Sequence, residues 1–216
     1  MIVLLDNQDS FVYNLVDALA GLSGQETVVY RNTVSAETVL GTAPDGVRPE
    51  LIVLSPGPGY PMTAGCMMEV IARAQGRIPI LGICLGYQAL VEHHGGRVVP
   101  CGPEHGVSLA MQLSPAGVDS PIFAGLATDS VPGIPGRMVP VARYHSLGAT
   151  QEPAGMRALA WAPSAIGEVM MAAETTDGMS VGVQFHPESL LTPAGPIMLA
   201  RCVEQLLKKG EHAHGN

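Results

Sequence analysis

The sequence predicts an α/β protein with one central, mostly parallel mixed sheet that is flanked by helices and extended by antiparallel strands. Three observations lead to this prediction. Apolar runs and helical patterns alternate over the first half of the chain, which is typical of a parallel α/β sheet. The strands read as unbroken apolar runs, which indicates burial on both faces. In the second half, strand-like segments are joined by turns, so we expect an antiparallel or mixed extension of the same sheet.

The amino-terminal half supplies the strands and helices of the parallel part. Each strand is a short apolar run, and each helix shows apolar residues at helical spacing. Helix starts are marked by capping residues and helix stops by glycine. In order, we expect strand 2–5, a helix capped by Asp9 or Ser10 and stopped by Gly21, strand 27–30, a short helix from Ser35, strand 51–54, a helix over roughly 64–75, strand 78–83 and a helix from Leu85 to Gly95.

The carboxy-terminal half changes character. Residues 128–137 hold two prolines and two glycines, so we expect an exposed loop there. Thr192 and Pro193 predict the start of the last helix, with a cap and an N1 proline. Gly210 predicts its end. The expected strands are 107–113, 138–142, 156–161, 168–173 and 179–185, and the last helix should bury Leu199, Cys202, Val203 and Leu206.

Length and composition bound the class of protein. The 216 residues, 47% of them hydrophobic, predict one globular domain over residues 1–210, followed by a frayed tail at 211–216. A net charge of −8 argues against nucleic acid or an acidic membrane as partner. The four cysteines form no CxxC pair and are interpreted as reduced thiols. The amino terminus resembles no signal peptide, and no apolar run is long enough to span a membrane. We therefore expect a cytoplasmic protein.

The segment Gly82-x-Cys84-x-Gly86 lies between a buried strand and a helix. This is the layout of a nucleophile elbow with cysteine in the place of serine. The glycines allow a sharp turn close to neighbouring backbone. The turn would present the sulfur at a helix amino terminus, where the helix dipole favours a thiolate. The alternative is a buried apolar cysteine, which is the usual fate of a free thiol.

A second group of polar residues follows another apolar strand. His186 ends this strand, Pro187 stops its pairing, and Glu188 lies close enough in sequence to contact the imidazole ring. A cysteine, a histidine and a carboxylate are the parts of an activated thiol. A structural histidine is the alternative, but the position at a strand end favours a catalytic one.

The proline- and glycine-rich loop over residues 55–61 is the third candidate. Its glycines allow backbone N–H groups to point at a ligand. The N–H groups of Gly57 and Leu85 could therefore form an oxyanion hole. A stiff surface turn is an equally good interpretation of this loop taken alone. The loop is neither a dinucleotide fingerprint nor a P-loop.

Four motifs in order along nearly the whole chain, SPGPG, GICLGYQ, YHSL and GVQFHPES, resemble the class I (triad) glutamine amidotransferase family. The resemblance implies that Cys84 attacks the side-chain amide of glutamine, that His186 donates a proton to departing ammonia, and that Glu188 orients His186. It also implies a set of residues that hold glutamine, which are Gly57, Pro58, Gly59, Leu85, Gln88, Ser146 and Leu147.

Within this family, the opening segment LLDNQDSFVYNLVDAL and the segment PVARYHSL are similar to amidotransferase subunits of anthranilate synthases, and next to those of para-aminobenzoate synthesis. The resemblance implies a chorismate-binding partner subunit that receives the ammonia. It implies no cofactor or metal on this chain, with Mg²⁺ on the partner. A stand-alone glutamine or γ-glutamyl hydrolase and a non-catalytic relative are the alternatives.

Three places differ from the usual family pattern. Tyr87 stands where histidine is common, and we expect it beside the glutamine pocket. Val107 follows His105 and Gly106 where lysine is usual, and the segment from Thr128 to Met138 is longer than expected. The last two lie outside the triad, so they concern the partner interface.

Overall fold

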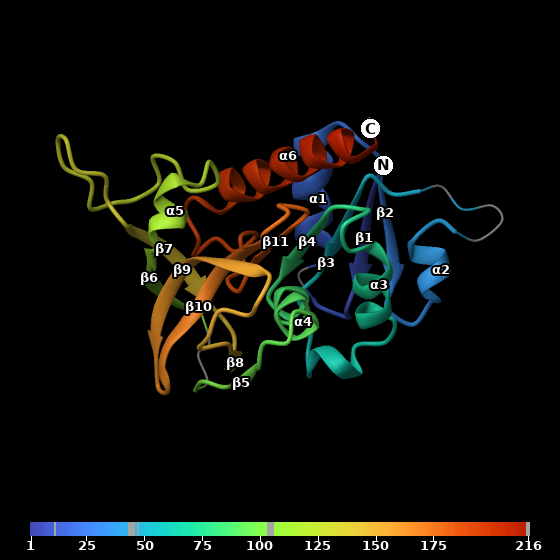
Figure 1. The fold of residues 1–216 in the computed structure, drawn as a ribbon, viewed down its shortest axis with the longest axis horizontal. Coiled ribbons are helices and arrows are strands. Elements are labelled where there is room, and N and C mark those ends of the chain that lie inside the picture. Colours follow the sequence, from blue (N-terminus) through green and yellow to red (C-terminus); the bar gives the residue numbers. More distant parts are fainter. Residues whose placement is uncertain (11, 43–45, 47, 103–105, 215–216) are drawn as a thin grey trace.

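The computed structural model describes residues 1–10, 12–42, 46, 48–102 and 106–214. Its strands and helices alternate through the first half, and strands dominate the second half (Figure 1). The strands are β1 (Ile2–Asp6), β2 (Thr27–Arg31), β3 (Leu51–Leu54), β4 (Ile80–Ile83), β5 (Val99–Pro100), β6 (Val107–Leu113), β7 (Met138–Arg143), β8 (Leu147–Gly148), β9 (Met156–Ser164), β10 (Gly167–Thr175) and β11 (Ser180–Val183). The helices are α1 (Val12–Ser23), α2 (Ala36–Val39), the 3₁₀ turn η1 (Pro61–Thr63), α3 (Met67–Ala74), α4 (Leu85–His93), α5 (Pro115–Asp119) and α6 (Gly195–His214).

One large mixed sheet organises the described part of the chain, with the strand order β2-β1-β3-β4-β11-β10-β9-β6-β7. Strands β2, β1, β3, β4 and β11 pair in parallel. Strands β10, β9, β6 and β7 extend the sheet by antiparallel pairing. This confirms the predicted α/β class with an antiparallel extension. It also places β11 beside β4, so the elbow and His186 follow neighbouring parallel strands.

Two apolar cores cover the two faces of the sheet. Successive strand residues face opposite sides, so Ile2 and Leu4 join one core while Val3 and Leu5 join the other. The first core packs against α1 and α6, and the second packs against α2, α3 and α4. As predicted, α6 buries Leu199, Cys202, Val203 and Leu206. The strands are therefore unbroken apolar runs because helices cover both faces.

Several predicted helix ends differ from the structure, and backbone conformation or a side-chain contact accompanies each difference. Helix α1 continues past Gly21 to Ser23, and Gly24 with φ of 60° follows it. Helix α3 begins at Met67 because Gly65, with φ of 55°, cannot continue a right-handed helix. Helix α6 starts at Gly195, because the hydroxyl of Thr192 is used elsewhere, as described below.

The carboxy-terminal end of α6 also differs from the prediction. The helix passes through Gly210 to His214, and His212 Nδ1 lies 2.5 Å from the carbonyl oxygen of Lys208. Gly210 is buried against Pro79, where a side chain would lie 3.0 Å from the proline ring. Gly210 thus allows α6 to pack closely against Pro79, and it does not end the helix. The division into a domain of residues 1–210 and a frayed tail stays a prediction, and residues 215–216 lie outside the described part.

Helix α5, strands β5 and β8 and the 3₁₀ turn η1 were not predicted. Helix α5 is capped by Ser114, whose Oγ accepts a 3.0 Å hydrogen bond from the N–H of Gly117. Strands β5 and β8 pair as a separate two-stranded sheet. Two residues per strand are too few to leave a pattern in the sequence.

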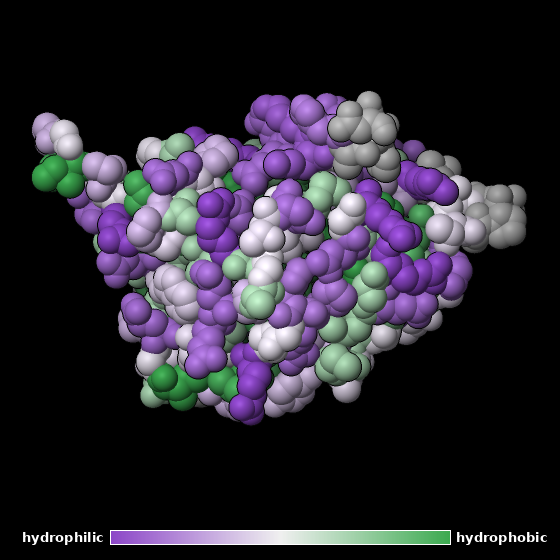
Figure 2. Space-filling view, in the orientation of Figure 1, coloured by the Kyte–Doolittle hydropathy of each residue, from purple (hydrophilic) through white to green (hydrophobic). Residues whose placement is uncertain are grey.

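The predicted exposed loop over residues 128–137 is confirmed for 128–135 and projects from the body near α5 and β7 (Figure 1). Asp129 Oδ1 accepts hydrogen bonds from the N–H groups of Arg137 and Met138, at 2.7 and 2.8 Å. The tip exposes Val131 and Ile134, and Figure 2 shows hydrophobic residues there. Among the described residues, no helix is long and apolar enough to cross a membrane.

Candidate active site

Cys84 lies at a strained turn between β4 and α4. Its φ of 50° and ψ of −100° are unusual for a residue with a side chain. A Cβ on Gly82 would lie 2.7 Å from the carbonyl oxygen of Gly86, and one on Gly86 would lie 2.4 Å from that of Leu54. Both glycines are therefore required by close approach of backbone, as the sequence indicated. Such strain persists where surrounding structure enforces it, and it is typical of functional sites.

His186 follows β11 and reaches the same edge of the sheet. Its Nδ1 lies 2.7 Å from Glu188 Oε1, and the Cys84 side chain is a second hydrogen-bond partner of the ring. The Glu188 side chain is only 2% exposed, and Cys84 is 8% exposed. The structure thus brings Cys84, His186 and Glu188 together in a largely desolvated array, although their catalytic roles stay predictions.

Contacts from other elements hold the backbone and ring of His186. Thr192 Oγ1 donates a 2.8 Å hydrogen bond to the His186 carbonyl and accepts a 3.0 Å bond from the N–H of Ala142. The Tyr144 ring packs edge-on against the imidazole, with centroids 5.2 Å apart, and the Tyr144 hydroxyl lies 3.2 Å from Ser189 Oγ. Sequence reasoning missed the roles of Thr192 and Tyr144. Thr192 reads as a helix cap from its neighbours alone, but its hydroxyl anchors His186 instead.

The electrostatics of the array favour an imidazolium on His186. Burial by itself lowers the pKa of His186, but its hydrogen bonds to Cys84 and Glu188 outweigh burial and raise the pKa to about 10. A proton on His186 places a positive charge beside the Cys84 sulfur. Since the folded pKa is raised, this contact stabilises the fold fully below the unfolded value of about 6.5, and the stabilisation is lost as pH rises through about 10.

We expect Cys84→Ala to lower the pKa of His186. The substitution removes one of the contacts that raise it, while burial, which lowers it, remains. The pKa can be read from the pH dependence of the imidazole signals in NMR spectra. Cys202→Ala removes a buried thiol on α6 and should leave the His186 signals unchanged. An unaltered His186 titration in Cys84→Ala would show that the sulfur does not stabilise the imidazolium.

The candidate oxyanion loop packs against the elbow. A Cβ on Gly57 would lie 2.5 Å from the carbonyl oxygen of Asn7 and 3.1 Å from a Leu85 methyl carbon. Asn7 fastens the loop, because its N–H donates to Ser55 Oγ at 2.8 Å and its Nδ2 donates to the Ser55 carbonyl at 2.9 Å. In the described part of the chain, neither the Gly57 N–H nor the Leu85 N–H donates to another protein group. Both donors are therefore unused within the described protein, and their role as an oxyanion hole stays a prediction.

The other residues expected to hold glutamine fall into two groups. Pro58 and Gly59 are exposed on the outer part of the loop, and Ser146 is exposed at the start of the turn into β8. Gln88 is buried, and its Nε2 donates to the Leu147 carbonyl at 3.1 Å. The Ser146 carbonyl accepts a 2.8 Å hydrogen bond from the N–H of Cys101, which connects this turn to the residue that follows β5. Their roles in binding glutamine stay predictions.

His145 helps to fix the Ser146 turn. Its Nδ1 lies 2.7 Å from the Leu147 carbonyl oxygen. Burial and the positive charge of Arg143 lower the pKa of His145 to about 4, although this hydrogen bond acts in the opposite direction. The ring is therefore neutral at physiological pH, and Nδ1 carries the hydrogen that it donates to Leu147.

A side chain at Gly57 should impair turnover strongly. In Gly57→Val the added atoms would collide with Asn7 and Leu85, which would move the loop donor away from the sulfur. Loss of one oxyanion donor typically costs about 10²–10³-fold in turnover. Gly21→Val is a suitable control, because a Cβ at Gly21 meets nothing within 4 Å. Steady-state kinetics with thermal unfolding would check this, and unchanged turnover would make the loop a surface turn only.

The structure places Tyr87 inside the protein. Its side chain is fully buried in the core on the α3 and α4 side of the sheet, so it lines no open surface, and its expected place beside the glutamine pocket stays a prediction. Its ring packs over Gly182, where a Cβ would lie 2.3 Å from the ring, and its hydroxyl donates to the Met170 carbonyl at 3.4 Å. Residue 87 follows Cys84 by almost one helical turn and faces the sheet. The presence of tyrosine, where the family pattern commonly has histidine, therefore affects the packing of the core.

The remaining candidates lie away from the array. Val107 is 44% exposed at the start of β6, and His105 lies outside the described residues. Cys66, Cys101 and Cys202 are free thiols, in keeping with the prediction of reduced cysteines. Burial raises the pKa of Cys66 and raises that of Cys202 to about 12. Within the described ranges, no three histidine, cysteine or acidic residues gather as a metal site.

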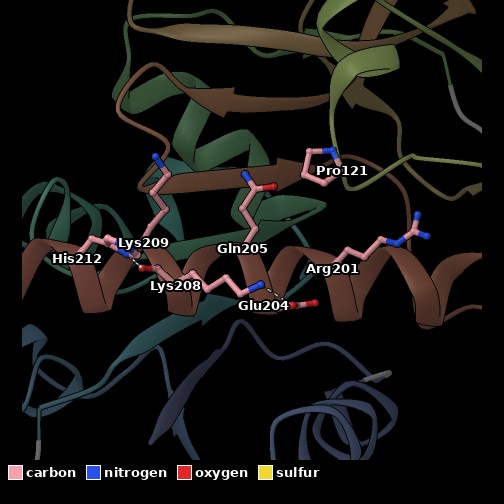
Figure 3. Close-up of a pocket in the computed structure, with 7 residues that line it drawn as sticks. All are labelled: Pro121, Arg201, Glu204, Gln205, Lys208, Lys209 and His212. Carbon is pink, nitrogen blue, oxygen red and sulfur yellow. Dashed lines mark hydrogen bonds and ion pairs between the residues drawn. The ribbon is translucent and has the colours of Figure 1, made fainter.

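A hollow of about 490 Å³ lies elsewhere, between α6 and Pro121 (Figure 3). Two of its basic side chains, Lys208 and Arg201, are engaged within the protein. Lys208 pairs with Glu204 at 2.6 Å, and Arg201 donates to the carbonyls of Ile122 and Ala124 at 3.2 and 2.8 Å. None of the sequence-predicted site residues lines this hollow.

Comparisons with known proteins point to one family. The family model described as "Glutamine amidotransferase class-I" matches residues 3–206. Anthranilate synthase component 2 of Corynebacterium glutamicum is 60% identical over 95% of this chain and 98% of its own length. The pyocyanine-specific component 2 of Pseudomonas aeruginosa is 44% identical over 92% of this chain and 90% of its own length. A solved glutamine amidotransferase of Thermotoga maritima shares the fold, with a TM-score of 0.63 at 16% identity, covering 96% of this chain and 97% of its own.

Proposed function

Because this chain belongs to the class-I glutamine amidotransferase family, we propose that it is the glutamine-hydrolysing subunit of an anthranilate synthase. It converts glutamine to glutamate and ammonia and passes the ammonia to a chorismate-binding partner that makes anthranilate and pyruvate. The single observation that supports the chemistry best is the array of Cys84, His186 and Glu188 at the elbow. The relatives named anthranilate synthase component 2 support the choice of synthase.

The reaction follows from the charges in the array. The Cys84 thiolate attacks the side-chain carboxamide carbon of glutamine, and the N–H groups of Gly57 and Leu85 bind the oxygen that becomes negative. The His186 imidazolium gives its proton to the departing nitrogen, so ammonia leaves and a γ-glutamyl thioester remains. Water then attacks the thioester while His186 takes a proton from it, which releases glutamate and restores the thiolate. Glu188 holds the ring through Nδ1, so the other ring nitrogen faces the reaction.

Exposed apolar residues follow the Gly57 loop and Glu188 along the sequence, and they support a partner that docks there. Met62 is 68% exposed and follows the Gly57 loop, and Leu190 is fully exposed two residues after Glu188. Apolar residues at the mouth of a site that must deliver ammonia are suited to a protein interface that excludes water. In this proposal any Mg²⁺ serves the chorismate reaction on the partner, so chelation should stop anthranilate formation without stopping glutamine hydrolysis.

The product formed with a partner tests the function. The chain is mixed separately with chorismate-binding subunits of anthranilate and aminodeoxychorismate synthases, with glutamine, chorismate and Mg²⁺, and the products are identified by mass spectrometry. Anthranilate with pyruvate is the expected result. Aminodeoxychorismate without anthranilate would instead make the chain a subunit for para-aminobenzoate synthesis. Full glutaminase activity alone, with no complex on gel filtration, would make it a stand-alone hydrolase.

Met62→Asp combined with Leu190→Asp should weaken the complex about tenfold or more in Kd, because charges would be buried at the interface. The variant should unfold at an unchanged temperature, since both side chains are exposed. Affinity can be measured by titration calorimetry with the partner subunit. Leu22→Asp is the matched control, because Leu22 is 40% exposed on the last turn of α1. Equal weakening in both variants would argue against an interface at the mouth of the site.

A further inference from the structure

Two buried amide side chains connect the candidate nucleophile to the turn at Ser146 and Leu147, which is expected to help hold glutamine. Gln184 lies between β11 and His186, and its Nε2 is 3.7 Å from Cys84 Sγ. Gln184 Oε1 accepts a 3.1 Å hydrogen bond from Gln88 Nε2, which also donates to the Leu147 carbonyl at 3.1 Å. Gln184 is completely buried and Gln88 is 3% exposed. A series of hydrogen bonds therefore connects the Leu147 carbonyl, through both amides, to the Cys84 sulfur.

The direction of donation along these hydrogen bonds is fixed by the Leu147 carbonyl. A backbone carbonyl can only accept, so the Leu147 oxygen requires the Gln88 amide to present its nitrogen. That nitrogen has two hydrogens, and the second one meets the Gln184 oxygen. Gln184 must then turn its own nitrogen toward Cys84. A 180° rotation of either amide would set two acceptors or two donors against each other between buried side chains, which is costly.

We propose that Gln184 stabilises the Cys84 thiolate as a hydrogen-bond donor and that Gln88 is a positioning residue that holds Gln184 in this orientation. The inference rests on the proposed function, because it concerns the nucleophile of that reaction. An amide cannot lose its proton at working pH, so Gln184 stabilises the anion without competing with His186 for the proton. The same bond favours the thiolate again when the thioester is hydrolysed.

The proposal also refines the expected role of Gln88. Both hydrogens of its Nε2 are used within the protein, by Leu147 and Gln184. Its amide nitrogen is therefore engaged in orientation rather than in holding glutamine. The resemblance assigns Leu147 to the residues that hold glutamine. A movement of the Ser146 turn would therefore change the position of both amides and their hydrogen bond to the sulfur.

The test measures the reactivity of Cys84 against pH. Wild type, Gln184→Met, Gln88→Met and the double variant react with iodoacetamide without a partner, and mass spectrometry quantifies labelled Cys84. Methionine keeps a similar length and removes the donor. Gln205→Met is the control, because Gln205 is partly buried and donates to Glu174 at 3.3 Å, away from the sulfur. The titratable groups that face the array are His186 with Glu188 behind it, Tyr144 against the imidazole, and His145, and all are unchanged in every variant.

In Gln184→Met, the midpoint of the alkylation profile should move to higher pH, and glutamine turnover should fall roughly 10–100-fold, as expected for loss of a hydrogen bond to a charged atom. Gln88→Met should shift the profile in the same direction by less. The double variant should match Gln184→Met, because Gln88 acts through Gln184. Gln205→Met should behave as wild type.

An unchanged profile and turnover in folded Gln184→Met would overturn the proposal, and additive effects in the double variant would overturn the role of Gln88. If gel filtration and thermal unfolding show that Gln184→Met does not fold, the Gln88→Met variant is used instead. An unchanged midpoint of its alkylation profile would also overturn the proposal. Failure of the proposed function is a different result. In that case wild type would hydrolyse no glutamine with any partner, and glutamine would not protect Cys84 from alkylation.

Discussion

Cys84→Ala should abolish glutamine-dependent synthesis by the complex and leave ammonia-dependent synthesis intact. The variant removes the nucleophile, and loss of a triad nucleophile typically costs about 10⁴–10⁶-fold. External ammonia bypasses this chain, since the chorismate reaction belongs to the partner. The side chain is small and the elbow glycines remain, so the complex should still form. Product formation from glutamine and from ammonium salts, each measured with the same partner subunit, checks both halves of the prediction.

The Cys84 prediction has a matched control in Cys66. Cys66 is partly exposed, but burial raises the pKa of its thiol, so it should be less reactive than its accessibility suggests. Cys66→Ala should therefore keep both activities. A glutamine analogue that alkylates thiols should label Cys84 and leave Cys66 free. Loss of both activities in a folded Cys84→Ala complex would rule out the ammonia-donor model.

His186→Ala should remove most of the glutaminase rate, and Glu188→Ala should remove noticeably less. His186 moves protons in both halves of the reaction, and proton transfer of this kind contributes roughly 10²–10⁴-fold. The imidazolium also balances the thiolate, so its loss should lower thiolate content as well. Glu188 acts only through the ring, by its 2.7 Å contact with Nδ1. Single-turnover rates of thioester formation would separate the two variants.

A histidine outside the array controls for this comparison. His94 is partly buried after the end of α4, where its Nε2 lies 3.2 Å from Gln75 Nε2, so His94→Ala should keep the wild-type rate. The pH profile adds a second criterion. Because the pKa of His186 is raised to about 10, wild-type activity should persist through neutral pH and decline as pH approaches 10. A Glu188→Ala enzyme slower than His186→Ala would mean that the two roles are exchanged.

The sequence by itself determined the features that depend on neighbouring residues. Unbroken apolar runs predicted β1, β3 and β4, because a strand covered on both faces needs apolar residues at every position. The glycines around Cys84 predicted a tight turn, and the structure shows that a Cβ at either glycine would meet backbone. The spacing of His186 and Glu188 predicted their contact, since two residues across a proline turn lie within reach. Four motifs in order indicated the family that the comparisons show.

Only the tertiary structure decided the features that join distant segments. The pairing of β4 with β11 brings Cys84 to His186, and no local pattern reveals which strands become neighbours. Thr192 reads as a helix cap until the fold brings His186 and Ala142 to its hydroxyl. Tyr87 could face the pocket or the core until the sheet fixes the side on which α4 packs. The amides of Gln88 and Gln184 are 96 positions apart, and their direction depends on a carbonyl at Leu147. Side-chain identity sets which hydrogen bonds are possible, but only packing decides which of them form and shields them from solvent.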